Sequence, residues 1–296
     1  MAERLRAAAH AKVNLFLRVL AREANGYHGL ETLFALAELH DDLEGVRRDR
    51  PGVGLAVEGA DCGPEEENLA GRAARLVLDA TGNRFGVDLR LVKRIPPGAG
   101  LGGGSSDAAA ALHLVNRLAG DAVPRHELMQ FAARLGADVP FFCSGAPLAL
   151  AWGHGERMLR LPPLAPHPVL LLLPPHPVNT AEAYGWMDAL QAGAGRRGPV
   201  AYDGSVLGGW GDLARLAGND FESAVFSRVP AVREAFEALA RTGPLFCRMS
   251  GSGSALFAVY RNERDREDAL MQLGRKYGRV VPTTLLAQSP AGPSAG

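Results

Sequence analysis

A glycine-rich run at residues 96–107 has the composition best suited to chemistry in this chain. It reads Pro96-Pro97-Gly98-Ala99-Gly100-Leu101-Gly102-Gly103-Gly104-Ser105-Ser106-Asp107, and five of these twelve residues are glycine. Glycine lets backbone N–H groups turn inward and approach an anion closely. Alternating apolar residues predict a strand at 87–92 before the run, and a helix is predicted at 108–119 after it. Because Ser105, Ser106 and Asp107 are good N-cap residues, the run predicts a phosphate site at a helix N-terminus.

Two known phosphate-binding patterns do not explain this run well. A Walker A motif needs a lysine directly after its last glycine, and none is present here. Gly98, Gly100 and Gly103 have the spacing of a dinucleotide fingerprint, with Asp121 near the expected acidic position, but any glycine-dense loop produces this match. A flexible linker is a further interpretation, which the flanking strand and helix disfavour.

Lys12, Asn14 and Asp138 are candidate residues outside the run. Lys12 and Asn14 are two positions apart in a predicted strand, so their side chains project from the same face. Asp138 follows a helix predicted at 124–135 and precedes Pro140, a place where aspartate is common in turns. Taken alone, Lys12 fits a solvated strand face and Asp138 fits a turn, so neither residue identifies a reaction.

Four sequence blocks together resemble the GHMP kinases. Besides the glycine run, they are His10-Ala11-Lys12-Val13-Asn14-Leu15-Phe16-Leu17 with Asn25-Gly26-Tyr27-His28, then Gly136-Ala137-Asp138-Val139-Pro140-Phe141-Phe142, and Met249-Ser250-Gly251-Ser252-Gly253-Ser254-Ala255-Leu256-Phe257. The blocks lie in the order of the family and span residues 10–257. The resemblance implies an α+β, two-domain GHMP kinase fold, with an S5-like N-terminal domain, a ferredoxin-like C-terminal domain and an active site in the cleft.

The resemblance also implies an ATP-dependent small-molecule kinase with an alcohol acceptor. Lys12 and Asp138 match the catalytic pair of the family, with Asp138 as the base for the hydroxyl proton and Lys12 as the cation that offsets phosphoryl charge. The loop from Pro96 to Ser106 would hold the ATP phosphates. Asn68 and Lys93 would lie near the adenine, although Asn68 fits a helix cap equally well. Mg²⁺ is expected to accompany ATP. The sequence does not identify its protein ligands, and Ser105 and Ser106 are the candidates.

The blocks around Lys12 and Tyr27-His28 resemble one type of member, which fixes the acceptor. They imply phosphorylation of the 2-hydroxyl of 4-diphosphocytidyl-2-C-methyl-D-erythritol, in non-mevalonate isoprenoid biosynthesis. Tyr27 and His28 would bind the cytosine, with Asn14 also at the substrate and Tyr184 closing the pocket. A GHMP kinase for homoserine or mevalonate is the alternative, which has no reason for Tyr27-His28. A catalytically silent binding protein of the same fold is a third interpretation, disfavoured by the intact Lys12 and Asp138.

Composition limits the other classes of function. The chain has 296 residues and 47% hydrophobic content, and its 32 basic residues cancel 32 acidic residues, so no net charge attracts nucleic acid or an acidic membrane. Cys62, Cys143 and Cys247 form no C-x-x-C pair, so neither a disulfide framework nor a zinc site is predicted. The longest aliphatic run, 169–173, is too short to cross a bilayer. We expect a cytoplasmic protein that binds no nucleic acid and no membrane, as a monomer or weak homodimer.

The sequence pattern changes near residue 153, and we place a domain boundary there. We predict an N-terminal ATP-binding domain at 1–153, a C-terminal domain at 154–288 and a disordered tail at 289–296. Residues 191–211 hold seven glycines without periodicity, which predicts a surface loop. Helices are expected at 68–80, 124–135, 180–190, 219–226, 231–241 and 265–277, and strands at 13–19, 31–39, 55–58, 168–173, 247–249, 255–260 and 279–286. The apolar run at 148–152 is expected to form a buried wall behind Asp138. Because these elements do not alternate strictly, an α+β class is favoured.

Overall fold

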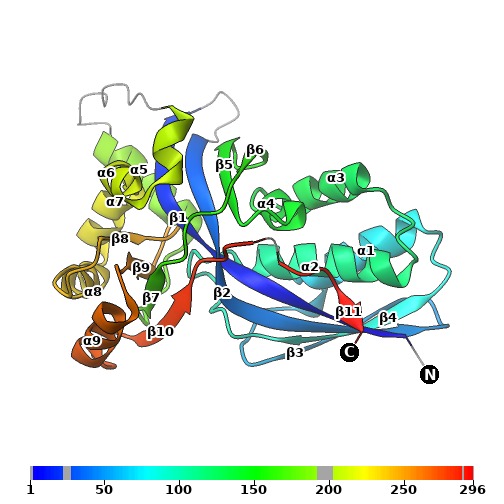
Figure 1. The fold of residues 1–296 in the computed structure, drawn as a ribbon. Helices are drawn as coiled ribbons and strands as arrows, with labels where there is room; N and C mark the ends of the chain where they lie inside the picture. Colours follow the sequence, from blue (N-terminus) through cyan, green and yellow to red (C-terminus); the bar gives the residue numbers. More distant parts are fainter. Residues whose placement is uncertain (1–2, 23–27, 192–202, 289, 296) are drawn as a thin grey trace.

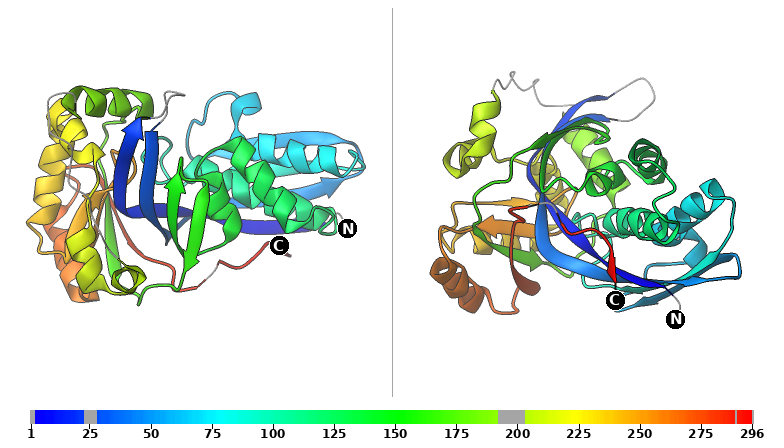
Figure 2. Two further views of the ribbon diagram at one scale, coloured as in Figure 1. Left: turned by 90° about the horizontal axis from the view of Figure 1, so that it is seen from above. Right: turned by 45° about the vertical axis from the view of Figure 1, so that its right-hand side comes forward.

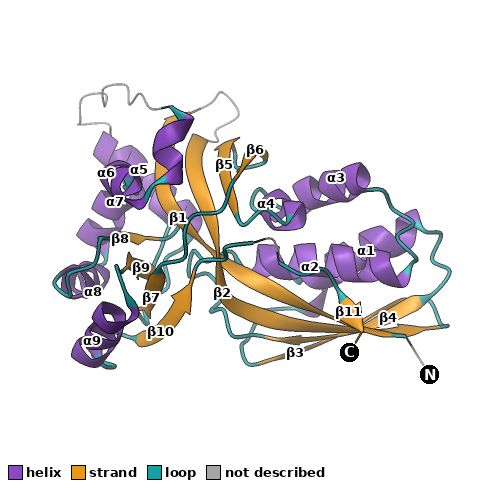
Figure 3. Ribbon diagram, viewed as in Figure 1, coloured by secondary structure: helices purple, strands orange, loops and turns teal. Residues whose placement is uncertain are grey.

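Two sheets, each covered by helices, make up the computed structural model of this chain (Figure 1). It describes residues 3–22, 28–191, 203–288 and 290–295. The α+β prediction is confirmed, because helices and strands form separate layers (Figure 3). Among the described residues, no helix is long and apolar enough to cross a membrane.

The first sheet is built on two long antiparallel strands, β1 (Arg4–Arg22) and β2 (His28–Arg48). Near its C-terminal end, β2 pairs with β4 (Gly86–Val92), which pairs in parallel with β3 (Gly52–Glu58). Near its N-terminal end, β2 pairs with β5 (Leu148–Gly153), and β5 pairs with β6 (Arg157–Leu161). The two long strands therefore connect the two halves of the sheet (Figure 1).

Four helices cover one face of this sheet: α1 (Leu69–Ala80), α2 (Gly103–Leu118), α3 (Arg125–Leu135) and α4 (Val139–Ser144). The helices α1 and α2 contact the strands, and α3 and α4 pack over α2 (Figure 2), with Phe141 of α4 also stacked on Phe34 of β2. Residues 108–111 of α2 are four consecutive buried alanines, so the helix can approach its neighbours closely. The start of α2 is therefore held firmly by the packing around it.

The second sheet has the strand order β10 (Arg279–Thr284), β7 (Pro168–Leu173), β9 (Leu256–Val259) and β8 (Phe246–Met249), all antiparallel. Its helices are α5 (Thr180–Gln191), α6 (Trp210–Leu216), α7 (Phe221–Arg228), α8 (Pro230–Ala240) and α9 (Glu263–Leu273). Alternate residues of β7 belong to different hydrophobic clusters, one with the helices and one with β1 and β2. A strand buried on both faces explains the continuous apolar run at 168–173.

The structure differs from the predicted organisation at four places. The strand β6 belongs to the first sheet, so a boundary at 153 divides the hairpin that it forms with β5. The helix α4 was not predicted, since six residues are too few for helical periodicity. Part of the predicted loop at 191–211 is helical, at 204–208 and in α6, while 192–202 lie outside the described residues. The predicted disordered tail contains β11 (Ser294–Ala295), which pairs with β1.

Candidate active site

The helix α2 begins at Gly103, earlier in the chain than the sequence predicted. Its N-cap is Gly102, whose φ of +71° lies in the left-handed region, so the predicted cap by Ser105, Ser106 or Asp107 is wrong. The N–H of Ser106 instead donates to the carbonyl oxygen of Gly102 at 2.9 Å. The N–H groups of 103–105 have no acceptor within the helix, and together with the helix dipole they favour a bound anion.

Two glycines of the loop lie where no larger residue fits. A Cβ atom on Gly100 would lie 2.1 Å from the carbonyl oxygen of Ser250, and one on Gly102 would lie 2.7 Å from Cζ of Phe142. Both glycines also have positive φ angles, which side chains disfavour. Close contacts with α4 and with the chain between β8 and β9 therefore constrain the conformation of the glycine loop.

The loop at 250–254, from the second sheet, holds the glycine loop in place. The Ser250 hydroxyl donates to the Gly100 carbonyl at 2.9 Å, and the N–H of Ala255 donates to the carbonyl of Ala99 at 3.0 Å. The Asn219 amide in turn donates to two carbonyl oxygens at 249 and 251, at 2.7 Å each. The sequence analysis missed Asn219, which no recognised motif marks.

Lys12 and Asp138 line the same cavity, beside the glycine loop. Lys12 is 3% exposed, and its Nζ donates to Asn14 Oδ1 at 2.7 Å and to the Gly100 carbonyl at 2.9 Å. The same Nζ is 3.8 Å from Oδ2 of Asp138. Burial lowers the pKa of Lys12, and the Asp138 carboxylate opposes this shift. Three oxygen atoms thus fix the ammonium in one position.

Asp138 directly precedes α4, at the end of the turn after α3. Its side chain makes no capping hydrogen bond to that helix and remains 33% exposed. The carboxylate lines a cavity together with Lys12 and the glycine loop. It is therefore available to a bound molecule, whereas a turn residue or helix cap would use its oxygen atoms locally.

Asn14 is buried between Lys12 and the loop of the second sheet. Its Nδ2 donates to the Thr32 hydroxyl at 2.7 Å, and its Oδ1 accepts from Lys12 and from the N–H of Gly251, the latter at 2.9 Å. As predicted, Lys12 and Asn14 share one face of the strand. These contacts give Asn14 a positioning role, and its predicted contact with substrate stays a prediction.

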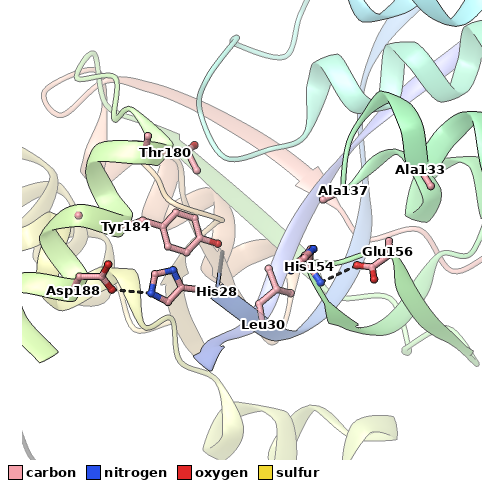
Figure 4. Close-up of a pocket in the computed structure, with 11 residues that line it drawn as sticks. His28, Leu30, Ala133, Ala137, His154, Glu156, Thr180, Tyr184 and Asp188 are labelled. Carbon is pink, nitrogen blue, oxygen red and sulfur yellow. Dashed lines mark hydrogen bonds and ion pairs between the residues drawn. The ribbon is translucent and has the colours of Figure 1, made fainter. Parts of the chain in front are cut away.

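The cleft has two compartments that share Leu30, Thr180 and Tyr184. The first, of about 310 Å³, contains Lys12 and Asp138 and extends to Leu69, Phe221 and Ser252. Of the predicted ATP loop it is lined by Pro96, Gly98, Ala99, Gly100, Gly102, Gly103, Gly104 and Ser105, and not by Pro97, Leu101 or Ser106. The second compartment, of about 900 Å³, is lined by α5 on one side and by His154 and Glu156 on the other (Figure 4).

His28 and Tyr184 meet in the second compartment. Their rings stack with centroids 5.2 Å apart and planes inclined by 16°. The Nε2 atom of His28 is 2.8 Å from Oδ1 of Asp188, and Tyr184 also touches the edge of Phe221. Burial raises the pKa of Tyr184, and the nearby Asp138 charge adds to this.

Tyr27 lies outside the described residues. The sequence analysis missed Asp188, although its i, i+4 spacing from Tyr184 placed both on one helix face.

Lys93 and Asn68 both have partners within the protein. Lys93 is buried, and its Nζ is 2.5 Å from a carboxylate oxygen of each of Asp41 and Asp107. Asn68 caps α1 by accepting from the N–H of Ala70 at 2.9 Å. The predicted contacts of Lys93 and Asn68 with adenine stay predictions. The ion pairs of Lys93 connect Asp107 of α2 with Asp41 of β2, which is a structural role.

Among the residues that the structure describes, no three His, Cys, Asp or Glu side chains group as metal ligands. Magnesium bound with ATP uses phosphate oxygens and water for most of its coordination, so it needs few protein ligands. Asp138 and Ser105 both line the first compartment, whereas Ser106 is buried. The donor set therefore suits a nucleotide-bound cation better than an independent metal centre.

Comparison with known proteins gives consistent matches along the chain. Residues 68–146 match the family described as GHMP kinases N terminal domain, and residues 202–279 match GHMP kinases C terminal. The 4-diphosphocytidyl-2-C-methyl-D-erythritol kinase of Prosthecochloris aestuarii is 38% identical over 93% of this chain and 96% of its own length. The enzyme of the same name from Pelotomaculum thermopropionicum is 40% identical over 96% of this chain and 97% of its own length.

Solved structures agree with these relatives. A crystal structure of 4-(cytidine 5′-diphospho)-2C-methyl-D-erythritol kinase is 38% identical, with a TM-score of 0.78 over 97% of this chain and 100% of that chain. A homoserine kinase from Cytophaga hutchinsonii has a TM-score of 0.74 over 99% of this chain and 98% of its own, but at 19% identity it shows only a shared fold. The chain thus belongs to the GHMP kinases, a family of small-molecule kinases, and within it to the group of 4-diphosphocytidyl-2-C-methyl-D-erythritol kinases.

Proposed function

We propose that this protein transfers the γ-phosphoryl group of ATP to the 2-hydroxyl of 4-diphosphocytidyl-2-C-methyl-D-erythritol. One observation carries the proposal: Lys12 and Asp138 lie in a compartment that adjoins both the start of α2 and the compartment of His28 and Tyr184. ATP bound at the start of α2 and an acceptor whose cytosine occupies the compartment of His28 and Tyr184 would bring their reacting groups together at this pair. The names of the relatives supply the identity of the acceptor.

Asp138 acts as the proton acceptor for the attacking hydroxyl. Phosphoryl transfer passes through a loose transition state, so the hydroxyl proton leaves late and a carboxylate is a sufficient base. Asp138 suits this role because its oxygens are free of local capping bonds and face the cavity. Lys12 keeps the carboxylate charged and offsets negative charge on the transferring group.

The start of α2 binds the phosphates of ATP. Backbone N–H groups at 103–105 and the helix dipole provide donors already in position, since the loop is fixed by its contacts with β1 and the 250–254 loop. When bound, Mg²⁺ neutralises charge on the donor phosphates. Ser105 and Asp138 are the cavity residues that would lie beside it.

The compartment of His28 and Tyr184 holds the cytidine end of the acceptor. A base can stack on an aromatic side chain at a gain of roughly 1–3 kcal/mol. Tyr184 and His28 offer ring faces and edges at one wall of the compartment (Figure 4). Tyr27, directly before His28 in the chain, is the predicted second aromatic partner.

The test is a panel of acceptors with purified protein and MgATP. We expect turnover with 4-diphosphocytidyl-2-C-methyl-D-erythritol and, in the phosphorus NMR spectrum of the product, a new monoester signal beside an intact diphosphate. Preferred turnover of homoserine or mevalonate would favour the alternative kinases, and absence of turnover with every acceptor would favour a silent binding protein. Light scattering of the same sample checks the prediction of a monomer or weak homodimer; the cytoplasmic location also stays a prediction.

A further inference from the structure

We propose that Asp188 is a positioning residue that makes the second compartment select cytosine over uracil, by fixing which ring nitrogen of His28 carries the proton. The inference rests on the proposed function and adds a specificity residue to it. Asp188 belongs to none of the sequence blocks that resemble the family, and it does not touch the reacting groups at Lys12 and Asp138.

The imidazole of His28 is held from two sides by one helix. His28 is only 8% exposed, with Tyr184 stacked on its face and Asp188 at its Nε2 atom. Tyr184 and Asp188 are four residues apart on α5, so their side chains lie on the same helix face (Figure 4). The stack fixes the ring plane, and the hydrogen bond fixes its rotation.

The Asp188 contact also determines the tautomer of His28. A carboxylate only accepts hydrogen bonds, so Nε2 of His28 must be the donor in the 2.8 Å contact. In the neutral imidazole, Nδ1 is then a lone-pair acceptor. Nδ1 has no hydrogen-bond partner among the residues that the structure describes, although His28 is largely buried and lines the cavity. This nitrogen is therefore an acceptor that awaits a donor from a bound molecule.

Cytosine supplies such a donor and uracil does not. The 4-position of cytosine carries an amino group, which donates, whereas the same position of a uracil-type base carries a carbonyl oxygen, which accepts. Facing Nδ1, the amino group makes a hydrogen bond, and the carbonyl places two lone pairs against each other. A site with a buried polar group rejects the ligand that leaves this group unpaired. Without Asp188, the proton could sit on Nδ1 and the preference would be lost.

The decisive variant is Asp188→Leu, which keeps the approximate side-chain size and removes the acceptor. Affinities for cytidine 5′-diphosphate and uridine 5′-diphosphate are measured by calorimetry, and kcat/KM is measured with the cytidine and uridine forms of the acceptor. We expect the cytidine preference of the unchanged protein to fall about tenfold, the loss expected for one hydrogen bond. The KM for ATP should stay unchanged, because the nucleotide donor binds in the other compartment.

Two further variants test the physical reason. Asp188→Asn retains an acceptor oxygen but also offers a donor, so its preference should fall between those of the unchanged protein and Asp188→Leu. Glu182→Gln removes a carboxylate from an exposed position of the same helix and should leave the preference unchanged. Nitrogen-15 NMR of histidine-labelled protein should show the Nε2–H tautomer of His28 in the unchanged protein and a mixture in Asp188→Leu.

Three results would overturn the inference: equal binding of the two nucleoside diphosphates by the unchanged protein, an undiminished cytidine preference in Asp188→Leu, or equal weakening of both nucleotides. The last result would mean that Asp188 only anchors α5 to β2. Failure of the proposed function is a separate outcome, recognised when the unchanged protein does not phosphorylate the diphosphocytidyl acceptor, whereas the nucleotide affinities are measured without turnover.

Discussion

At the scale of single residues, the proposed catalytic pair is Lys12 and Asp138, whose Nζ and Oδ2 atoms lie 3.8 Å apart. We predict that Asp138→Asn folds normally and lowers kcat by about 10²–10⁴-fold, since the amide has nearly the same shape but cannot accept the proton. Lys12→Met should lose activity to a similar extent. The losses in the double variant should not add, because the two residues act as a unit.

Steady-state kinetics of the three variants check this prediction. Asp49→Asn, at an exposed bend that lines neither compartment of the cleft, is the matched control for loss of a carboxylate and should retain kcat. A loss below about threefold in Asp138→Asn would leave Asp138 as a turn residue without a catalytic role.

At the scale of elements, the start of α2 is expected to bind the phosphates of ATP. Gly104 is exposed there, and a Cβ atom on it would touch only Leu69, at 3.9 Å, so a larger side chain would extend into the cavity. Gly103 is less suitable for a test, because its Cβ would lie 2.9 Å from Ile95 and disturb the core. We predict that Gly104→Val raises the KM for ATP on the order of tenfold to a hundredfold, with little change for the acceptor.

The matched control is Gly211→Val in α6, where a Cβ atom would have no neighbour within 4 Å. Its KM for ATP should equal that of the unchanged protein. If Gly104→Val bound ATP as tightly as the control, the phosphate site would have to lie elsewhere.

A second prediction for α2 concerns Asp107, which joins this helix to Lys93 and to Asp41 on β2. Burial raises the pKa of Asp107 to about 7, although the Lys93 charge opposes this. In the unfolded chain an aspartate titrates at about pH 4, so the native protein binds this proton more tightly. Asp107 therefore contributes stability at low pH, and this contribution is lost as the pH rises from about 4 to about 7.

Urea unfolding at several pH values, with the unchanged protein and Asp107→Asn, measures this contribution. The stability of the unchanged protein relative to the variant should fall between about pH 5 and pH 7 and then level off. A difference that stays constant over this interval would show that Asp107 is ionised throughout.

At the scale of the whole molecule, the proposed catalytic site lies where the loop at 250–254, from the second sheet, meets β1. Asn219 is central to this contact: its amide holds the 250–254 loop, and its neighbours at 218 and 220 bond to Leu17 on β1. We predict that Asn219→Ala lowers the free energy of unfolding by about 2–4 kcal/mol, because buried carbonyl oxygens lose their donor. Since the same loop contacts Asn14 beside Lys12, kcat should also fall.

Chemical denaturation and kinetics on one preparation test both effects. Asn262→Ala is the control, since Asn262 caps α9 at an exposed position, and it should cost about 1 kcal/mol with no change in kcat. A stable Asn219→Ala protein with unchanged kcat would show that the two sheets do not need this residue.

The sequence by itself determined the local elements and the chemical parts of the site. Period-two alternation placed Lys12 and Asn14 on one strand face, and the structure joins their side chains at 2.7 Å. The apolar run at 168–173 and the helix after Asn68 were also readable, because these patterns depend on neighbours within a few residues. The glycine run indicated a phosphate site for the same reason, since its backbone freedom is a local property.

Only the tertiary structure decided which distant residues meet. Lys12 and Asp138 are far apart in sequence, as are His28 and Asp188, and no periodic pattern encodes their contacts. Phe142 of α4 and Ser250, in the loop between β8 and β9, leave no room for a Cβ atom on Gly102 and Gly100, so the loop before Gly103 follows a path that only glycine can adopt. Such contacts depend on side-chain packing between elements, and this packing forms only when the two sheets have folded against each other.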